Sequence, residues 1–89
     1  MSSIFIYLGK RFELLRKIRE AGYGVRMHAY EYYVWKDGFV SIIFLQPNFG
    51  RAYIYMVESN GEKSWRAAER VSNILRSMDE SLKIEIIGV

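Results

Sequence analysis

The chain contains few of the side chains from which catalytic and metal sites are built. It has no cysteine and a single histidine, His28. The composition therefore excludes disulfides, thiolate nucleophiles and cysteine-containing zinc sites, and one histidine does not make a histidine-rich metal site. No serine or cysteine stands beside His28 to serve as a nucleophile, and strand alternation puts Glu31 on the other face of the same expected strand. We therefore interpret His28 as structural, and we expect no cofactor and no metal.

Two glycine-containing segments invite comparison with nucleotide-binding loops. Gly22-Tyr23-Gly24 lacks the third glycine of a dinucleotide fingerprint and follows a helical pattern, so we interpret it as a helix cap. Gly9-Lys10-Arg11 lacks both the first glycine of a P-loop and the Ser or Thr after its lysine. Lys10 and Arg11 still stand where a helix would present unpaired N–H groups to a phosphate. Alternatively, both side chains extend into water.

The positive charge is concentrated in the first part of the chain. The formal net charge is +3, and residues 1–36 hold seven Lys or Arg against three Glu. A basic helix next to aromatic strands would suit single-stranded nucleic acid, because phosphates need cations and bases stack on aromatic rings. No helix-turn-helix, RNP-like or zinc-finger signature accompanies this pattern. The candidate anion or nucleic-acid contacts are Lys10, Arg11, Arg16, Lys17 and Arg51.

The elements that would position these residues follow from periodicity and turn signals along one compact domain, residues 1–89. Strands are expected at Ser3–Leu8, Val25–Trp35, Phe39–Leu45, Arg51–Val57 and Leu82–Val89, and helices at Lys10–Ala21 and Ser64–Met78. The order β-α-β-β-β-α-β predicts an α+β two-layer sandwich, with two helices on one face of a mixed, mainly antiparallel sheet of about five strands. The first helix is expected to join two parallel strands by a right-handed crossover.

Local signals predict where the two helices start, and they leave one alternative for the first helix. Residues 3–8 could instead begin the first helix, which would then run from Ser3 through Gly9 at a cost of about 1 kcal/mol for a glycine in the helix interior. Ser59-Asn60-Gly61 is a turn signal, and Ser64 is the expected N-cap of the second helix. Trp65, at the start of that helix, is expected to be a core anchor.

The Asp37-Gly38 dipeptide predicts a β-hairpin but leaves its register open. A two-residue turn pairs Trp35 with Val40 and Tyr33 with Ile42. A three-residue turn with Gly38 in the left-handed position pairs Tyr32 with Ile42 instead.

Both faces of the predicted sheet carry apolar and aromatic side chains, but two short helices can cover only one of them. Strand alternation gathers amphipathic side chains on the uncovered face, and the candidate interface residues there are His28, Tyr30, Tyr32, Tyr53 and Tyr55, with Arg51 beside them. A large exposed apolar patch usually marks an interface. We therefore expect either a homodimer that buries this face or a ligand that stacks on it. In the plainer interpretation, the tyrosines only pair across strands at a wet surface.

These observations lead to one functional expectation and two alternatives. We expect a small, non-enzymatic, cytoplasmic module that self-associates as a dimer and binds a protein or nucleic-acid partner. One alternative is a single-stranded nucleic-acid platform. The other is a metal-independent enzyme with its site at a dimer cleft, since scattered side chains leave no motif. The longest apolar run, residues 4–8, is too short to span a membrane, and the scarcity of Asn and Gln suggests a thermophilic source.

Overall fold

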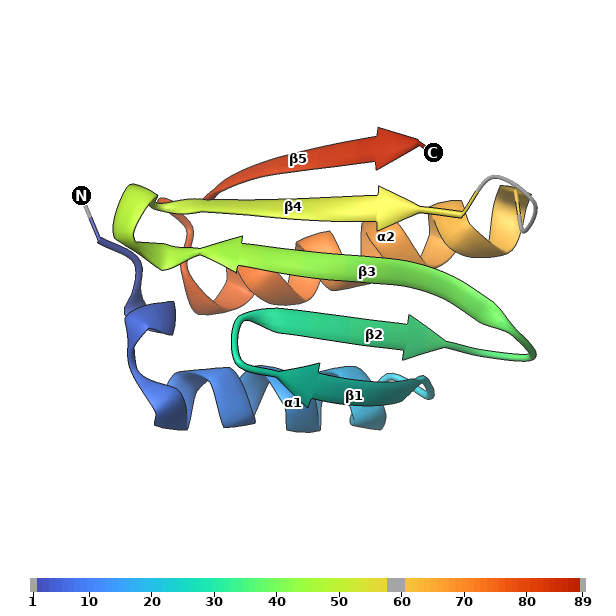
Figure 1. Cartoon of the computed structure of the whole chain (residues 1–89), viewed down its shortest axis with the longest axis horizontal. Helices are drawn as coiled ribbons and strands as arrows, with labels where there is room; N and C mark the ends of the chain where they lie inside the picture. The colour runs from blue at the N-terminus through green and yellow to red at the C-terminus, as the bar shows by residue number, and fades with distance from the viewer. Residues whose placement is uncertain (1, 58–60, 89) are drawn as a thin grey trace.

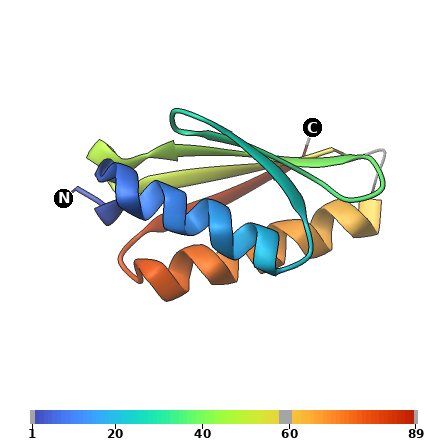
Figure 2. The same ribbon diagram turned by 90° about the horizontal axis from the view of Figure 1, so that it is seen from below.

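The computed structural model of the chain describes residues 2–57 and 61–88. Its elements are η1 (Ile4–Ile6), α1 (Leu8–Glu20), β1 (Gly24–His28), β2 (Glu31–Trp35), β3 (Phe39–Gln46), η2 (Pro47–Phe49), β4 (Arg51–Met56), α2 (Gly61–Met78) and β5 (Lys83–Gly88), where η denotes a 3₁₀ helix. The strands form one mixed sheet in the order β1-β2-β3-β4-β5. Both α-helices lie on the same face of this sheet (Figures 1 and 2). The predicted α+β class is confirmed.

The first predicted strand, Ser3–Leu8, is wrong. This segment forms η1, in which the Phe5 N–H donates to the Ser3 hydroxyl at 3.3 Å. Phe5 is fully buried whereas Tyr7 is exposed, so the segment contributes one side chain to the core rather than a strand to the sheet. Tyr7 has an extended backbone (φ −85°, ψ 128°) that separates η1 from α1. A continuous helix from Ser3 through Gly9 therefore does not form either.

The predicted strand Val25–Trp35 is two strands. A two-residue turn at Ala29 and Tyr30 reverses the chain, and β1 pairs antiparallel with β2, with His28 opposite Glu31. Ala29 has a φ of 55°, a left-handed conformation that glycine or asparagine usually signals in a sequence. Neither residue marks this turn, so sequence reasoning missed it. The sheet keeps five strands because one predicted strand is lost and another divides.

The same turn changes which side chains share a face. Val25 lies opposite Val34, and Met27 opposite Tyr32, so these four side chains point toward the helices. A continuous strand would have separated Val25 and Met27 from Tyr32 and Val34. The other face of the hairpin carries Arg26, His28, Glu31, Tyr33 and Trp35.

The β2–β3 hairpin adopts the register of a two-residue turn over most of its length. Tyr33 pairs with Ile42, which excludes the Tyr32–Ile42 alternative. Near the turn the register shifts, and Trp35 pairs with Phe39 instead of Val40. Asp37 and Gly38 both have positive φ, 55° and 127°, as expected for an Asp-Gly hairpin turn.

The only parallel pair among the described strands is β4 with β5, and α2 connects these two strands. The predicted parallel pair around the first helix is therefore wrong, because the strand that would precede this helix does not exist. The predicted N-cap Ser64 lies inside α2, and its hydroxyl donates to the Val57 carbonyl at 2.9 Å. Ser59, Asn60 and Val89, which belong to a predicted turn and a predicted strand, lie outside the described residues.

The core lies between the helices and the sheet. The helices contribute Leu14, Ile18, Ala67, Ala68, Val71 and Leu75, and the sheet contributes Val25, Tyr32, Val34, Ile43, Leu45, Ala52 and Ile54. Ala67 and Ala68 have small side chains, which let the backbone of α2 lie close to the sheet. Within residues 2–57 and 61–88, no helix lies on the opposite face of the sheet (Figure 2).

Candidate functional site

The sheet face opposite the helices, called the open face below, is covered by neither α1 nor α2. Cross-strand registers and alternation place on it Arg26, His28, Glu31, Tyr33, Trp35, Ile42, Phe44, Gln46, Arg51, Tyr53, Tyr55, Lys83, Glu85 and Ile87. It is the face turned toward the viewer in Figure 1, where the helices lie behind the strands.

Apolar and aromatic side chains occupy the centre of the open face in two adjacent rows. The first row runs across the strands from Tyr33 through Ile42 and Tyr55 to Ile87, and the second contains Phe44 and Tyr53. All six are half-buried. A shallow depression of about 480 Å³ lies over four of the six and is lined by Glu31, Ile42, Phe44, Gln46, Tyr53 and Tyr55. A broad depression of this kind suits stacking and flat packing better than chemistry at one point.

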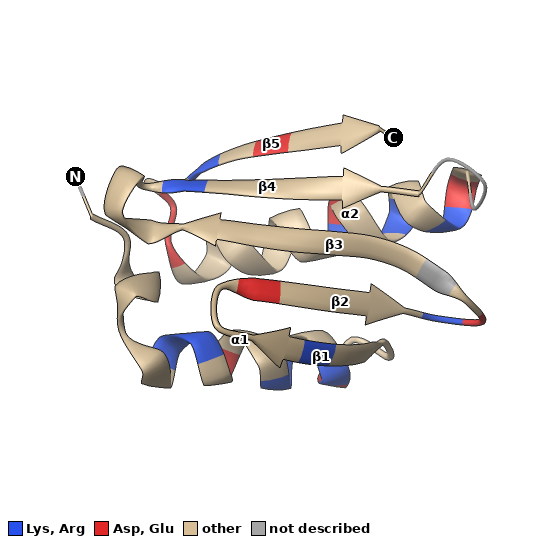
Figure 3. Cartoon of the chain, viewed as in Figure 1, with Lys and Arg blue, Asp and Glu red and all other residues tan. Residues whose placement is uncertain are grey.

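The charges on the open face are mixed in sign. Glu31 lies opposite Phe44, and Glu85 lies opposite Tyr53, so the aromatic row ends in carboxylates at both sides. Arg51 and Lys83 are register partners in the next row, so two positive charges lie side by side there. Figure 3 shows basic positions at the start of β4 and β5 and an acidic position further along β5.

The predicted interface residues divide between the two sides of the sheet. His28, Tyr53 and Tyr55 lie on the open face, as predicted. The assignment of Tyr32 to this face is wrong. Its side chain has 0% exposure and points toward α1, where its hydroxyl donates to the Arg11 carbonyl at 2.7 Å. Burial raises the pKa of the Tyr32 hydroxyl well above its usual value, although the nearby Arg11 acts in the opposite direction.

The turn at residues 29–30 accounts for what sequence reasoning misplaced on this face. It moves Tyr32 under the helices and brings Tyr33 and Trp35 to the open face in its place. It also puts Glu31 on the same face as His28, which corrects the expectation that they lie on opposite faces. The sequence contained one signal that could have placed Ile42 and Phe44 on the open face. This signal is the apolar character of both faces of the Phe39–Leu45 run.

The side chain of Arg11 makes contacts within the fold. Its guanidinium donates to the carbonyls of Phe5 and Ile6 at 2.8 and 3.0 Å and lies 4.3 Å from the centre of the Tyr30 ring. Arg11 thereby connects η1, α1 and the β1–β2 turn. Tyr30, which was predicted to lie on a strand, is an exposed residue of this turn.

The other candidate cations on α1 are paired or lie in a groove. Lys10 lies 3.6 Å from Glu13, and Arg16 lies 2.9 Å from Glu20. Both pairs are on the helical side of the sheet, away from the open face (Figure 2). Of the five predicted anion contacts, Arg51 alone shares a face with Tyr53 and Tyr55.

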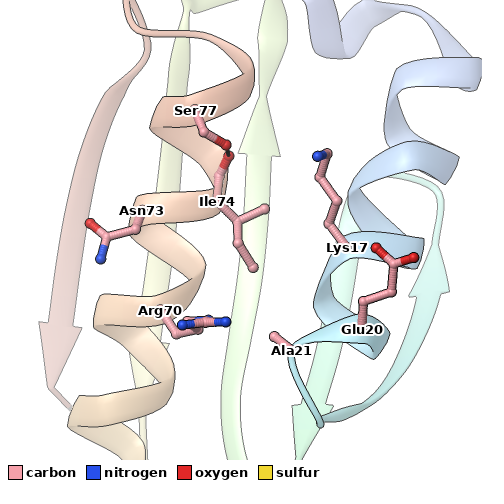
Figure 4. Close-up of a pocket in the computed structure, with 7 residues that line it drawn as sticks. All are labelled: Lys17, Glu20, Ala21, Arg70, Asn73, Ile74 and Ser77. Atoms are coloured by element: carbon pink, nitrogen blue, oxygen red, sulfur yellow. Dashed lines mark hydrogen bonds between the residues drawn. The ribbon is translucent and has the colours of Figure 1, made fainter.

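Lys17 lines a groove between the two helices. The groove encloses about 320 Å³ and is lined by Lys17, Glu20, Ala21, Arg70, Asn73, Ile74 and Ser77. Figure 4 shows Arg70 and Ile74 directed from α2 toward α1, while Asn73 points the other way. The Ser77 hydroxyl donates to the Ile74 carbonyl at 2.6 Å, and Glu20 accepts from Arg16. The polar groups of the groove therefore do not converge on one point.

Residues 2–57 and 61–88 contain no group of three His, Asp or Glu side chains that could hold a metal ion. Within these residues, neither helix combines the length and apolar character that a membrane span requires. No protein-family model, no curated protein and no solved structure matches the chain.

Proposed function

We propose that the protein is a small, non-enzymatic interaction module that self-associates by packing the open faces of two copies against each other. The observation that carries this proposal is the continuous row Tyr33, Ile42, Tyr55 and Ile87, which crosses four strands and is covered by neither of the described α-helices. A contiguous apolar surface that the fold leaves partly exposed, as here, marks interaction sites in soluble proteins. Aromatic side chains are also enriched at the centres of protein interfaces.

The size of the open face is of the same order as the surface that each partner buries in a stable dimer. A standard interface buries roughly 800 Å² on each partner, and the accessible surface of the chain is 5415 Å². Five strands about 4.8 Å apart and six residues long span roughly 24 by 20 Å before side-chain relief is added. The required area is therefore of the same order as this one face.

The charges favour a second copy over nucleic acid. Glu31 and Glu85 flank the aromatic centre, where they would face the phosphates of a strand stacked on Phe44 and Tyr53. The cations of α1 lie on the other side of the sheet and cannot offset them. A surface that packs on itself needs both signs at its rim, and Arg51 and Lys83 supply the positive ones.

Light scattering tests self-association directly. At about 0.1 mM, which populates dimers with micromolar dissociation constants, the wild type should have at least twice the 10.5 kDa mass of the chain. Phe44→Lys should halve the measured mass, because it places a charge at the centre of the open face. Phe12→Lys is the matched control, since Phe12 is half-exposed on α1. A monomeric wild type, or an unchanged mass for Phe44→Lys, contradicts the proposal.

The adjacency of Arg51 to Tyr53 and Tyr55 supports one alternative, a single-stranded nucleic-acid platform. Titration of tryptophan fluorescence with single-stranded oligonucleotides at low salt distinguishes the two functions. Binding that weakens with salt and is lost in Arg51→Ala would favour the platform.

A further inference from the structure

The strand β5 lies beyond the cover of the helices. Helices pack about 8–10 Å apart and strands about 4.8 Å apart, so two helices cover about four strands. The helix α1 packs against β1, and α2 packs against β3 and β4. Figure 1 shows α2 behind these two strands. Ile84 and Ile86 point toward the helical layer from β5 but are only partly buried.

A groove runs between α2 and this uncovered strand. It encloses about 210 Å³ and is lined by Trp65, Glu69, Ser72, Asn73, Arg76, Ile84 and Ile86. Trp65 is 48% exposed, so the expectation that it is a core anchor is wrong. Apolar side chains of α2 and β5 therefore line this groove but do not fill it.

Among the described strands, none pairs with the outer side of β5, so backbone groups on that side have no strand partner. The Lys83 N–H donates to the Gly50 carbonyl at 2.9 Å, so the backbone groups of Lys83 point toward β4. By alternation, those of Ile84 and Ile86 point toward the free edge. A six-residue edge strand with three isoleucines and no proline is a template for pairing with another strand.

We propose that β5 pairs antiparallel with β5 of a second copy, in a register centred on Ile84, and so joins two five-stranded sheets into one. A two-fold axis perpendicular to the sheet keeps each face continuous, so residues can pair only with residues of the same face. In the register centred on Ile84, Lys83 of each copy lies opposite Glu85 of the other. Both charges are exposed on the open face, and the contact forms two reciprocal ion pairs.

The other symmetric registers overlap a longer part of β5 but fit its charges less well. A register centred on Glu85 puts two carboxylates opposite each other, which is destabilising. One centred on Ile86 leaves Lys83 and Glu85 without charge partners. Within residues 2–57 and 61–88, neither side chain has an ion-pair partner inside the chain, and Lys83 lies beside the like charge of Arg51. Glu85 of a second copy would relieve this repulsion.

The opposite edge of the sheet lacks this self-complementarity. The strand β1 carries Arg26 and His28 on the open face and no acidic residue. Antiparallel self-pairing centred on Arg26 places the two Arg26 side chains opposite each other, and pairing centred on Met27 places Arg26 opposite His28, so neither register gives Arg26 an acidic partner. The two edges therefore differ in charge pattern, and β5 is the one suited to a second copy.

The β5 contact is independent of the proposed packing of open faces. The two-fold axis of the edge contact is perpendicular to the sheet, whereas the axis that packs two open faces lies in its plane. Where two perpendicular two-fold axes cross, they generate a closed assembly of four chains. Both contacts together predict a tetramer of about 42 kDa, four times the 10.5 kDa chain, and either contact alone predicts a dimer.

Charge reversal with native mass measurement tests the register. Measured at a protein concentration near the dissociation constant of the edge contact, Lys83→Glu and Glu85→Lys should each lower the mean mass toward half, because each variant opposes like charges and weakens the contact on the order of tenfold. An equimolar mixture of the two variants should restore the mass, since one copy then presents two carboxylates opposite two ammonium groups of the other. The double variant Lys83→Glu/Glu85→Lys should restore it as well. Lys63→Glu, an exposed reversal on α2, should have no effect.

The Phe44→Lys variant separates this inference from the proposed function. If both contacts exist, Phe44→Lys and Lys83→Glu each give dimers and their combination gives a monomer. If Phe44→Lys leaves the mass unchanged but the charge reversals reduce it, the edge contact stands without the packing of open faces. If single reversals match the wild type, or if their mixture does not recover what each has lost, the β5 contact is overturned.

Discussion

The Ser3 hydroxyl donates a hydrogen bond to the Asp79 carboxylate at 2.6 Å and thereby joins two parts of the chain 76 residues apart. The same carboxylate accepts from the Ser81 hydroxyl at 2.6 Å and from the Ser81 N–H at 3.2 Å. The Ser3 N–H donates to the Pro47 carbonyl at 2.8 Å. Asp79 therefore holds the segment before η1 against the turn between α2 and β5, with η2 beside them.

Asp79→Asn should destabilise the protein by about 1 kcal/mol at pH 7, because it weakens these hydrogen bonds without changing the size of the side chain. Burial acts to raise the pKa of Asp79, but the hydrogen bonds from Ser3 and Ser81 outweigh it and hold this pKa below its usual value. A lowered folded-state pKa gives stabilisation that is present above about pH 4 and is lost as the pH falls further. Urea unfolding should show a difference between wild type and variant at pH 7 that shrinks toward pH 2. A difference of equal size at both pH values contradicts the role of the charged carboxylate.

Tyr32→Phe should lower the free energy of unfolding by about 1 kcal/mol at neutral pH, because the hydrogen bond to the Arg11 carbonyl is lost. The raised pKa of Tyr32 adds a pH dependence. Above about pH 10 the unfolded chain loses this proton while the folded chain keeps it, so wild-type stability falls as the pH rises. The Phe variant lacks this contribution, and urea unfolding at pH 8 and pH 11 should show a smaller loss for it. Tyr7→Phe, at an exposed position, should behave like the wild type.

Arg11→Lys should destabilise the protein by about 1–2 kcal/mol, because an ammonium group cannot reproduce two carbonyl contacts and stacking on Tyr30. Arg16→Lys should change stability by less than about 0.5 kcal/mol, since the pair with Glu20 is exposed. Thermal or urea unfolding of both variants provides the comparison. Equal stability of the two variants would show that Arg11 is not a structural contact and would restore it as an anion-binding candidate.

Gly24→Ala should displace the indole of Trp35 from β1. A Cβ atom at position 24 would lie 2.3 Å from two ring atoms of Trp35, its register partner, and no side-chain contact is that short. Because Trp35 is partly exposed, its ring can move at a cost of about 1 kcal/mol. In a Trp65→Phe background, where Trp35 is the remaining tryptophan, its fluorescence emission should shift to longer wavelength. An unchanged spectrum would contradict the close packing of the indole on Gly24.

The fold class was predictable because it depends on patterns that several residues share. The apolar spacing of Val71, Leu75 and Met78 predicted the second helix, and Asp37-Gly38 predicted the hairpin that β2 and β3 form. The errors occur where one residue overrides such a pattern. Residues 4–6 have a strand-like apolar pattern but form a 3₁₀ helix in which only Phe5 is buried. Ala29 adopts a left-handed conformation that its residue type does not signal.

The composition of the open face was only partly predictable for the same reason. Tyr53 and Tyr55 were assigned correctly because β4 is one uninterrupted strand. Tyr32 and Tyr33 were exchanged because the face of each depends on the turn that precedes β2. The uncovered position of β5 follows from the widths of helices and strands in three dimensions, which no local pattern in the sequence records.

The two-residue length of the turn at Ala29 and Tyr30 also limits which changes this hairpin can tolerate. Because β2 returns directly opposite β1, one inserted or deleted residue here would shift the register of β2 against β1 by one residue. Tyr32 and Val34 would then leave the core for solvent, and Glu31 would move toward the helices. Substitutions in this turn, such as Ala29→Gly, should therefore be tolerated far better than any change in its length.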